Sequence, residues 1–215
     1  MLTVGDVVAK RGITEVLHFT TNRGLAGILA SRGVKARNQL PADKFVEHVY
    51  GPTCKVRRDT SWLGYVNLSI TSINSALFNI ASRKWYPERD FWWCVLSFTP
   101  LVLEHEGVLF VTTNNMYTGA KRLGGAVGLE ALFSPSIVQF VAAGGATGAI
   151  TRALNLPPSQ PTCRMAEALY PTALSTEWLQ RVYVATAEHA DIVHGQCDAL
   201  SHVVPDVAVR PDVFE

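Results

Sequence analysis

Residues 15–33 read EVLHFTTNRGLAGILASRG and predict a strand that leads directly into a helix. Residues 15–19 are mostly apolar, with valine and phenylalanine among them, which favours an extended strand. Three apolar residues then recur at helical spacing, so a short amphipathic helix is expected over residues 22–32. Asn22 is the expected N-cap of this helix and Gly33 its expected stop. A strand–helix unit therefore opens the predicted fold.

Polar side chains gather where this strand meets the helix. His18, Thr20 and Asn22 alternate with other residues at the end of the strand. Taken alone, this pattern fits an ordinary strand end with an N-cap as well as a binding site.

Two further segments carry charged residues whose role stays open. Arg57 and Arg58 lie in a modest basic segment, residues 34–62, where a solvated turn would explain them. Glu167 lies in an otherwise apolar strand, residues 165–170, directly after a long loop. This carboxylate is either a surface residue of an edge strand or a site residue with a tuned environment.

The composition indicates one folded domain over residues 1–215. Apolar residues make up 48% of the chain and charged residues 17%, which excludes a disordered or fibrous protein. The formal net charge is +1, so a nucleic acid would have to be bound by a local basic patch. Four widely spaced cysteines without a CxxC pair favour a reduced, cytoplasmic protein. The most apolar strip, residues 91–98, is far shorter than the ~20 residues of a membrane helix, so no membrane is expected.

Strands outnumber helices in the rest of the chain and do not alternate with them regularly, which disfavours a doubly wound parallel sheet. Further strands are expected at residues 65–70, 91–98, 108–113, 178–185 and, weakly, 202–209. Helical turns are expected at residues 74–81, 120–133 and 189–194. Residues 134–162 are rich in Gly, Ala, Pro and Thr, which predicts a long functional or mobile loop.

Common catalytic signatures are absent from the sequence. It has no GxxxxGK[ST], no GxGxxG after a strand, no HExxH and no GxSxG. His189, His194 and His202 are poorly spaced for a metal, so no metal site is expected.

Four stretches, taken in order, resemble the DarT family, toxins that transfer ADP-ribose from NAD onto a DNA base. They are HFTTNRGLAGILASRG (18–33), CKVRRDTSWLGYVNLSI (54–70), CVLSFTPLVLEHEGVLFVTTNNMY (94–117) and RMAEALYPTALSTEWLQRVYV (164–184). The last stretch is the most specific of the four, and the resemblance runs from about residue 14 to residue 195.

This resemblance implies an α+β, ADP-ribosyltransferase-like fold, in which two small crossed antiparallel β-sheets surround an NAD cleft with flanking helices. NAD would be the substrate. Glu167 would be the catalytic carboxylate, and Arg57 or Arg58 would assist attack by the base. The implied NAD-binding residues are His18, Thr20, Asn22, Leu25 and Tyr65. The implied DNA-binding residues are Lys35, Arg37, Lys55, Arg152 and Arg164.

The resemblance also implies the partners. The loop at residues 134–162 would close on single-stranded DNA, and a macrodomain-type antitoxin would neutralise the toxin. The thymidine-modifying branch of the family has a more aromatic strand followed by a Pro-Arg-Ser-Pro turn. Here the chain reads YVNLSITSIN, with Asn67 and Asn74 in place of those groups, so both thymine and guanine stay open as the modified base.

Three other functions also stay open: ADP-ribosylation of RNA or protein, RNA 2′-phosphate transfer on the same scaffold, and a catalytically silent module that binds nucleic acid. The phosphotransferases need several arginines around the cleft, whereas this sequence shows clearly only the pair at Arg57 and Arg58.

Overall fold

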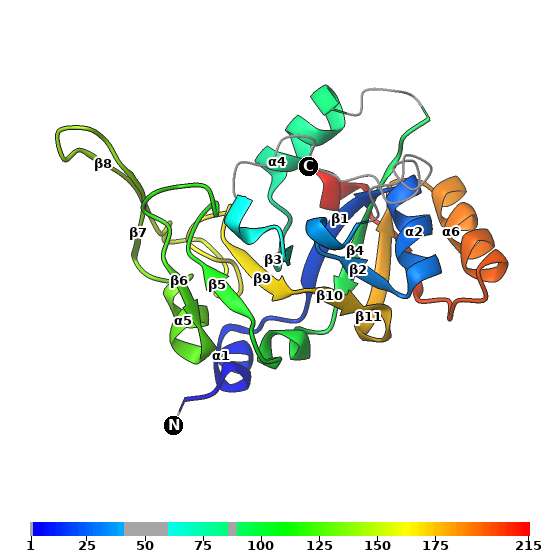
Figure 1. Cartoon of the computed structure of the whole chain (residues 1–215), viewed down its shortest axis with the longest axis horizontal. Helices are drawn as coiled ribbons and strands as arrows, with labels where there is room; N and C mark the ends of the chain where they lie inside the picture. The colour runs from blue at the N-terminus through cyan, green and yellow to red at the C-terminus, as the bar shows by residue number, and fades with distance from the viewer. Residues whose placement is uncertain (1, 41–59, 86–89) are drawn as a thin grey trace.

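A continuous series of strands organises the computed structural model (Figure 1), in which residues 2–40, 60–85 and 90–215 are described. The strands are β1 Val16–Thr21, β2 Gly33–Lys35, β3 Tyr65–Ile70, β4 Trp93–Phe98, β5 Leu109–Val111, β6 Arg122–Gly124, β7 Ser136–Val141, β8 Thr147–Thr151, β9 Glu167–Pro171, β10 Ala173–Ser175, β11 Leu179–Val184 and β12 Asp206–Val209. Eight of them follow the order β12-β11-β4-β1-β3-β9-β5-β6, while β10 pairs with β2 and β7 with β8.

The α-helices lie between these strands. They are α1 Val4–Arg11, α2 Asn22–Ser31, α4 Ser75–Ile80, α5 Gly125–Ala131 and α6 Ala187–Ala199. A π-helical turn, Ala81–Trp85, continues α4. Short 3₁₀ turns cover Arg37–Gln39, Thr60–Trp62, Pro100–Glu104, Thr176–Trp178 and Pro211–Phe214.

The long series of strands is weakly joined at its middle. Strand β1 pairs with β4 along its whole length, but with β3 only at Val16↔Ile70 and Leu17↔Ser69. The strands therefore form two halves, β12-β11-β4-β1 and β3-β9-β5-β6, connected by this short pairing. The expected α+β class is confirmed, with the two expected sheets merged into one series at β1 and β3.

Strand β1 contributes to a core on each of its faces because successive side chains of a strand point to opposite sides. Val16 packs into the larger core with Leu25 of α2, and both are fully buried. Leu17 belongs to a second cluster, which includes Phe78 and Trp93. Each large apolar side chain buried in this way contributes roughly 1.5–3 kcal/mol to folding. These cores fix the position of the strand that carries His18.

The strand–helix unit differs from the sequence expectation at both ends of the helix. Thr21, not Asn22, is the N-cap, and its hydroxyl accepts a hydrogen bond from the Gly24 amide at 3.1 Å. The helix stops at Arg32, whose φ of 54° lies in the left-handed region. Gly33 instead begins β2, where an added Cβ would lie 3.1 Å from the Leu174 carbonyl oxygen. Both shifts follow because the strands on either side extend further than their apolar runs predict.

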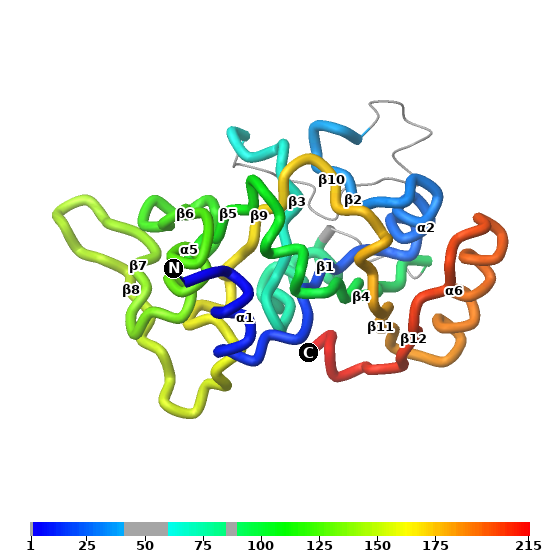
Figure 2. Tube along the Cα trace, turned by 90° about the horizontal axis from the view of Figure 1, so that it is seen from below, coloured from blue at the N-terminus to red at the C-terminus, as the bar shows by residue number. Residues whose placement is uncertain are grey.

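The prediction of an irregular loop is wrong for residues 136–151, which form the β7–β8 hairpin seen projecting from one end of the molecule (Figures 1 and 2). Gly144 and Gly145 supply the positive φ values, 94° and 84°, that the turn requires. Residues 120–133 likewise contain strand β6 before helix α5. In addition, β11, α6 and the parallel strand β12 form one β-α-β unit, an exception to the expected lack of alternation.

Candidate active site

Three polar residues, one each from β1, β3 and β9, come together just beyond the point where the pairing of β1 with β3 ends. The ring Nδ1 of His18 lies 3.1 Å from the main-chain oxygen of Asn67. The side-chain amide of Asn67 donates to Glu167 Oε2 at 3.0 Å. Asn67 pairs with Leu169 on β9, so Glu167, two residues earlier, is its diagonal neighbour on the same face of the sheet. Positions 18, 67 and 167 thus form one hydrogen-bonded chain.

Glu167 is buried at this junction, with 7% of its surface exposed. On one side β9 pairs with β3, and on the other Glu167 itself pairs with Val111 of β5. A buried carboxylate is unfavourable unless hydrogen-bond donors compensate for lost water, and Asn67 supplies such a donor. The alternative of an exposed edge-strand residue is therefore wrong for Glu167.

His18 favours its neutral form in this arrangement and donates to Asn67 through Nδ1. Burial lowers the pKa of its half-buried ring, and the hydrogen bond to Asn67 opposes this effect only in part. A carbonyl oxygen can only accept, so in the neutral ring Nδ1 carries the hydrogen. The opposite nitrogen, Nε2, then has a lone pair available for a hydroxyl group.

The lowered pKa of His18 predicts how stability changes with pH. An unfolded histidine takes up a proton near pH 6.5, whereas the folded protein takes it up only at lower pH. The contribution of His18 to the free energy of unfolding is therefore fully present above about pH 6.5 and is lost as the pH falls through the folded pKa of His18. The free energy of unfolding of the wild type minus that of His18→Gln should therefore decrease as the pH is lowered from about 7.5 to about 5. Urea unfolding at the two pH values measures it, and a constant or wider difference would argue against a neutral His18.

Thr20 and Asn22 follow His18 in the sequence, where β1 passes into α2. Thr20 is 2% exposed, and its hydroxyl occupies the space that a side chain at position 24 would need. The Asn22 amide group donates to the Asp90 carbonyl at 3.1 Å, while its Oδ1 is buried with no partner among the described residues. Both predicted residues thus lie within four positions of His18, on its C-terminal side.

Leu25 and Tyr65, the other two predicted NAD-binding residues, differ in position. Leu25 is fully buried in the core behind α2. Tyr65 is half-buried on the same face of β3 as Asn67. Its ring lies 5.6 Å from that of Trp62, and the Arg122 guanidinium lies 5.3 Å over Trp62. Trp62 and Arg122, which lie in this group of contacts, are not among the predicted site residues, and Asn67 was noted only as a departure from the family pattern, because no local pattern reveals contacts between distant strands.

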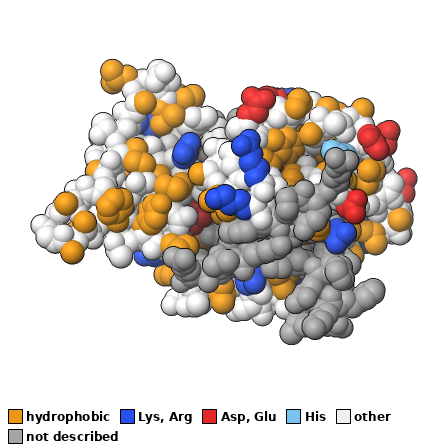
Figure 3. Space-filling model, turned by 90° about the horizontal axis from the view of Figure 1, so that it is seen from above, with side chains coloured by type: hydrophobic (Ala, Val, Ile, Leu, Met, Phe, Trp, Pro, Cys, Tyr) orange, Lys and Arg blue, Asp and Glu red, His pale blue; other side chains and the backbone are white. Residues whose placement is uncertain are grey.

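The predicted DNA-binding and base-activating residues occupy varied positions. Lys55, Arg57 and Arg58 lie outside the described residues. Lys35 and Arg37 are half-buried near the end of β2. Figure 3 shows Lys and Arg side chains gathered near the middle of one face, while most Asp and Glu side chains in this view lie towards its edge.

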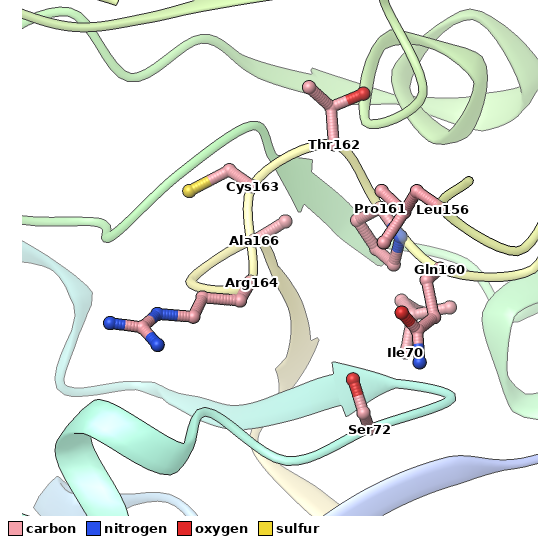
Figure 4. A pocket seen from close by; sticks show the side chains of 9 residues that line it. All are labelled: Ile70, Ser72, Leu156, Gln160, Pro161, Thr162, Cys163, Arg164 and Ala166. Atoms are coloured by element: carbon pink, nitrogen blue, oxygen red, sulfur yellow. The ribbon is translucent and has the colours of Figure 1, made fainter. Parts of the chain in front are cut away.

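The segment just before Glu167 lines a small cavity of about 80 Å³, with Arg164 among the lining residues (Figure 4). Arg152 donates at 2.8 Å to the carbonyls of Pro157 and Gln160, so it braces this segment from within. Arg164 lines the cavity and is exposed, and its side chain extends away from Gln160. The other lining residues are Ile70, Ser72, Leu156, Pro161, Thr162, Cys163 and Ala166.

Two negative findings concern the described residues alone. Over residues 2–40, 60–85 and 90–215, His, Cys, Asp and Glu form no group of three or more that could hold a metal ion. Within the same ranges, every helix is too short or too polar to cross a membrane.

Comparisons with known proteins give this chain a family and a fold. A family model described as "DarT: ssDNA thymidine ADP-ribosyltransferase, DarT" matches residues 17–215. A search of curated proteins gives no match.

Solved structures show the same fold. Thermus sp. 2.9 DarT in complex with NAD⁺ matches with a TM-score of 0.66 at 15% identity, over 94% of this chain and 98% of that one. Its complex with ADP-ribosylated ssDNA gives a TM-score of 0.67 at 14% identity, over 95% and 97% of the two chains. Thermosipho africanus DarTG in complex with ADP-ribose gives 0.57 at 10% identity, over 94% of this chain and 51% of that one.

Proposed function

Because the chain belongs to the DarT family of ssDNA thymidine ADP-ribosyltransferases, we propose that it transfers ADP-ribose from NAD⁺ to thymidine in single-stranded DNA, with Glu167 as its catalytic carboxylate. The observation that carries this assignment is the buried Glu167, hydrogen-bonded to Asn67 and through it joined to His18.

The chemistry requires a carboxylate at such a position. The bond between the ribose C1′ and the nicotinamide nitrogen breaks, and its electron pair leaves with nicotinamide, which departs neutral. Positive charge grows on the ribose, as in other oxocarbenium-like displacements. Glu167 accepts a hydrogen bond from the ribose 2′-hydroxyl and stabilises that charge most strongly in the transition state. The attacking nitrogen of thymine forms the new bond to C1′, and Glu167 takes up its proton.

The neighbouring residues hold NAD⁺ in place for this step. The free Nε2 of neutral His18 suits a ribose hydroxyl, which can donate to it. Thr20, Asn22 and Tyr65 complete the NAD⁺ site. Leu25 contributes only by holding α2 in the core, since its side chain is fully buried.

DNA binds on the side of the molecule that carries the NAD⁺ site, because the target base must reach Glu167. The strand must be single or the base flipped out, since the reacting edge of thymine is otherwise used in pairing. Phosphates are bound by Lys35, Arg37, Lys55 and Arg164, and the segment containing the β7–β8 hairpin closes over the strand. Arg152 supports that segment through the carbonyls it binds. Such charge-based binding weakens as salt is added.

Arg57 or Arg58 is proposed to polarise the carbonyl oxygen of the base as its nitrogen attacks. Arg57→Ala or Arg58→Ala should therefore lower the rate of DNA modification about 10²-fold or more, with little change in the affinity for NAD⁺. Activity assays and calorimetric NAD⁺ titrations of each variant measure the two effects. Arg210→Ala, which removes an exposed arginine paired with Asp212, is the control. An equal loss of both properties would place the arginine at NAD⁺ instead.

A toxin of this kind implies a neutralising partner, and a macrodomain-type antitoxin is proposed on the strength of the family. A cytoplasmic location is proposed because DNA and NAD⁺ are both available there.

The function is tested by incubating the protein with labelled NAD⁺ and separate pools of ssDNA, dsDNA, RNA and protein. Label in ssDNA alone supports the proposal. Label in RNA or protein alone would instead support one of the other transferases, and release of RNA 2′-phosphate would identify a phosphotransferase. If no pool is labelled and no phosphate is released, the chain is a binding module. Digestion of the labelled DNA to nucleosides then shows whether thymidine or deoxyguanosine is the target.

A further inference from the structure

We propose that Asn67 is a positioning residue that keeps Glu167 ionised and oriented for the reaction. This inference rests on the proposed function, since it concerns the state of the carboxylate assigned to the chemistry. Asn67 lies in the strand that is more aromatic in the thymidine-modifying branch of the family. It is not among the residues assigned above to the binding of NAD⁺ or of DNA phosphates.

Both halves of Asn67 contact the candidate catalytic residues. Its side-chain nitrogen donates to Glu167 Oε2 at 3.0 Å, and its main-chain oxygen lies 3.1 Å from His18 Nδ1. The side-chain contact fixes the orientation of the amide, because the reverse orientation would set Oδ1 against a carboxylate oxygen. A donor to the ionised form of a carboxyl group lowers its pKa. Asn67 therefore favours the charged form of Glu167.

This orientation of the Asn67 amide leaves its side-chain oxygen without a hydrogen bond. Asn67 Oδ1 is buried and has no hydrogen-bond partner among the described residues. Buried polar atoms are nearly always paired, so an exception calls for a physical reason. With the nitrogen directed at the carboxylate, the oxygen points where none of the described residues offers a donor. The unpaired oxygen is the consequence of holding Glu167.

Few described titratable or charged groups face Glu167 from the elements packed around it. His18 of β1 is joined to it through Asn67, and Tyr65 lies on the same face of β3. Val111 of β5 pairs with Glu167 and carries no charge, while Arg122 of β6 pairs with Val111 on its far side. The Arg122 guanidinium is bound to the side-chain and main-chain oxygens of Asn115. Asn67 thus makes a direct side-chain hydrogen bond to Glu167, and its removal can be tested.

Two substitutions separate the donor from the shape of the side chain. Asn67→Asp keeps the shape but replaces the donor with a second carboxylate, and two adjacent carboxyl groups resist ionising together. Asn67→Leu removes the donor without adding charge. The pKa of Glu167 should therefore rise in both variants, and further in Asn67→Asp than in Asn67→Leu. A residue that merely fills space would leave this pKa unchanged.

The matched control is Asn114→Asp. Asn114 lies in the turn after β5, where its Oδ1 accepts from the Met116 amide at 2.9 Å. An aspartate makes the same side-chain contact to a turn amide, so this variant adds the same charge without touching Glu167.

The experiment measures kcat and KM for NAD⁺ across the pH range, using an ssDNA oligonucleotide, for the wild type and the three variants. The acid limb of the kcat profile should move up by about one pH unit or more in Asn67→Asp. Because the carboxylate also loses the hydrogen bond that orients it, kcat at neutral pH should fall about 10-fold or more. The KM for NAD⁺ should change little. The profile of Asn114→Asp should match that of the wild type.

A second readout keeps this test independent of the proposed function. Carbon-13 NMR titration of the glutamate carboxyl groups follows Glu167 directly, once its signal is identified by its absence in Glu167→Gln. An unchanged Glu167 titration in Asn67→Asp would overturn the role of Asn67, whatever the substrate. A wild type that leaves DNA unmodified, with Glu167 titrating as expected here, would instead refute only the proposed function.

Discussion

Replacing Glu167 with Gln is expected to lower the rate of DNA modification about 10³-fold or more. The substitution keeps the shape of the side chain and an oxygen that can accept from Asn67 Nδ2, which lies 3.0 Å from the native carboxylate. It removes the negative charge that stabilises the ribose and the base that takes up the proton. Because Glu167 is 7% exposed, a neutral group is at least as easily buried there as the carboxylate. The fold should therefore survive.

Three measurements separate loss of chemistry from loss of structure in Glu167→Gln. Single-turnover assays give the rate of transfer, calorimetry gives the affinity for NAD⁺, and thermal unfolding gives stability. The account expects a large loss in the first and small changes in the other two. A Glu167→Gln enzyme that works within a few-fold of the wild-type rate would show that another residue carries the reaction.

Gly128→Ala is expected to destabilise the fold by about 3 kcal/mol, a large share of the ~5–15 kcal/mol that a domain has. Gly128 lies in α5, where an added Cβ would overlap the Leu123 carbonyl oxygen and lie 2.6 Å from its carbonyl carbon. Since these are main-chain atoms, β6 or the helix must move as a whole. Strand β6 pairs with β5, which pairs in turn with Glu167. The strain therefore reaches the site as well as the core.

Urea unfolding of Gly128→Ala measures this loss, and Gly195→Ala is its matched control. Gly195 lies in α6, where an added Cβ would meet open space. Alanine there should be neutral or stabilising by up to about 1 kcal/mol, since it favours helix more than glycine does. Equal stabilities of the two variants would mean that α5 does not pack on β6 as described.

Local apolar patterns predicted the parts of the fold that depend on neighbouring residues. Strand β3 was expected at residues 65–70 and is confirmed there, because its alternation reflects one buried and one polar face. Strand β8 was missed because its residues, TGAIT, are small, uncharged and at most half-buried, so they resemble a loop in composition. Strand β7, SIVQFV, does have the β-branched and aromatic residues of a strand, but the loop prediction included it with the Gly-, Ala- and Pro-rich stretch that follows. Helix α1, with its capping box at Thr3, also escaped notice.

The site depended more on resemblance than on pattern. Glu167 and His18 were both singled out from the sequence, yet nothing local places them together. Their connection runs through Asn67, a hundred positions from Glu167 in the sequence, and follows from the pairing of β3 with β9. Register between distant strands is set by tertiary packing, which a single sequence does not display. For this reason Asn67 stood out only as a departure from the family pattern.

Mass spectrometry of nucleosides from ssDNA treated with the protein and NAD⁺ tests the central claim most directly. The account predicts one new nucleoside, thymidine that carries a single ADP-ribose, which is missing when Glu167→Gln replaces the wild type. DNA that yields only unmodified nucleosides, under conditions where the protein binds NAD⁺ and labels RNA or protein instead, would contradict it.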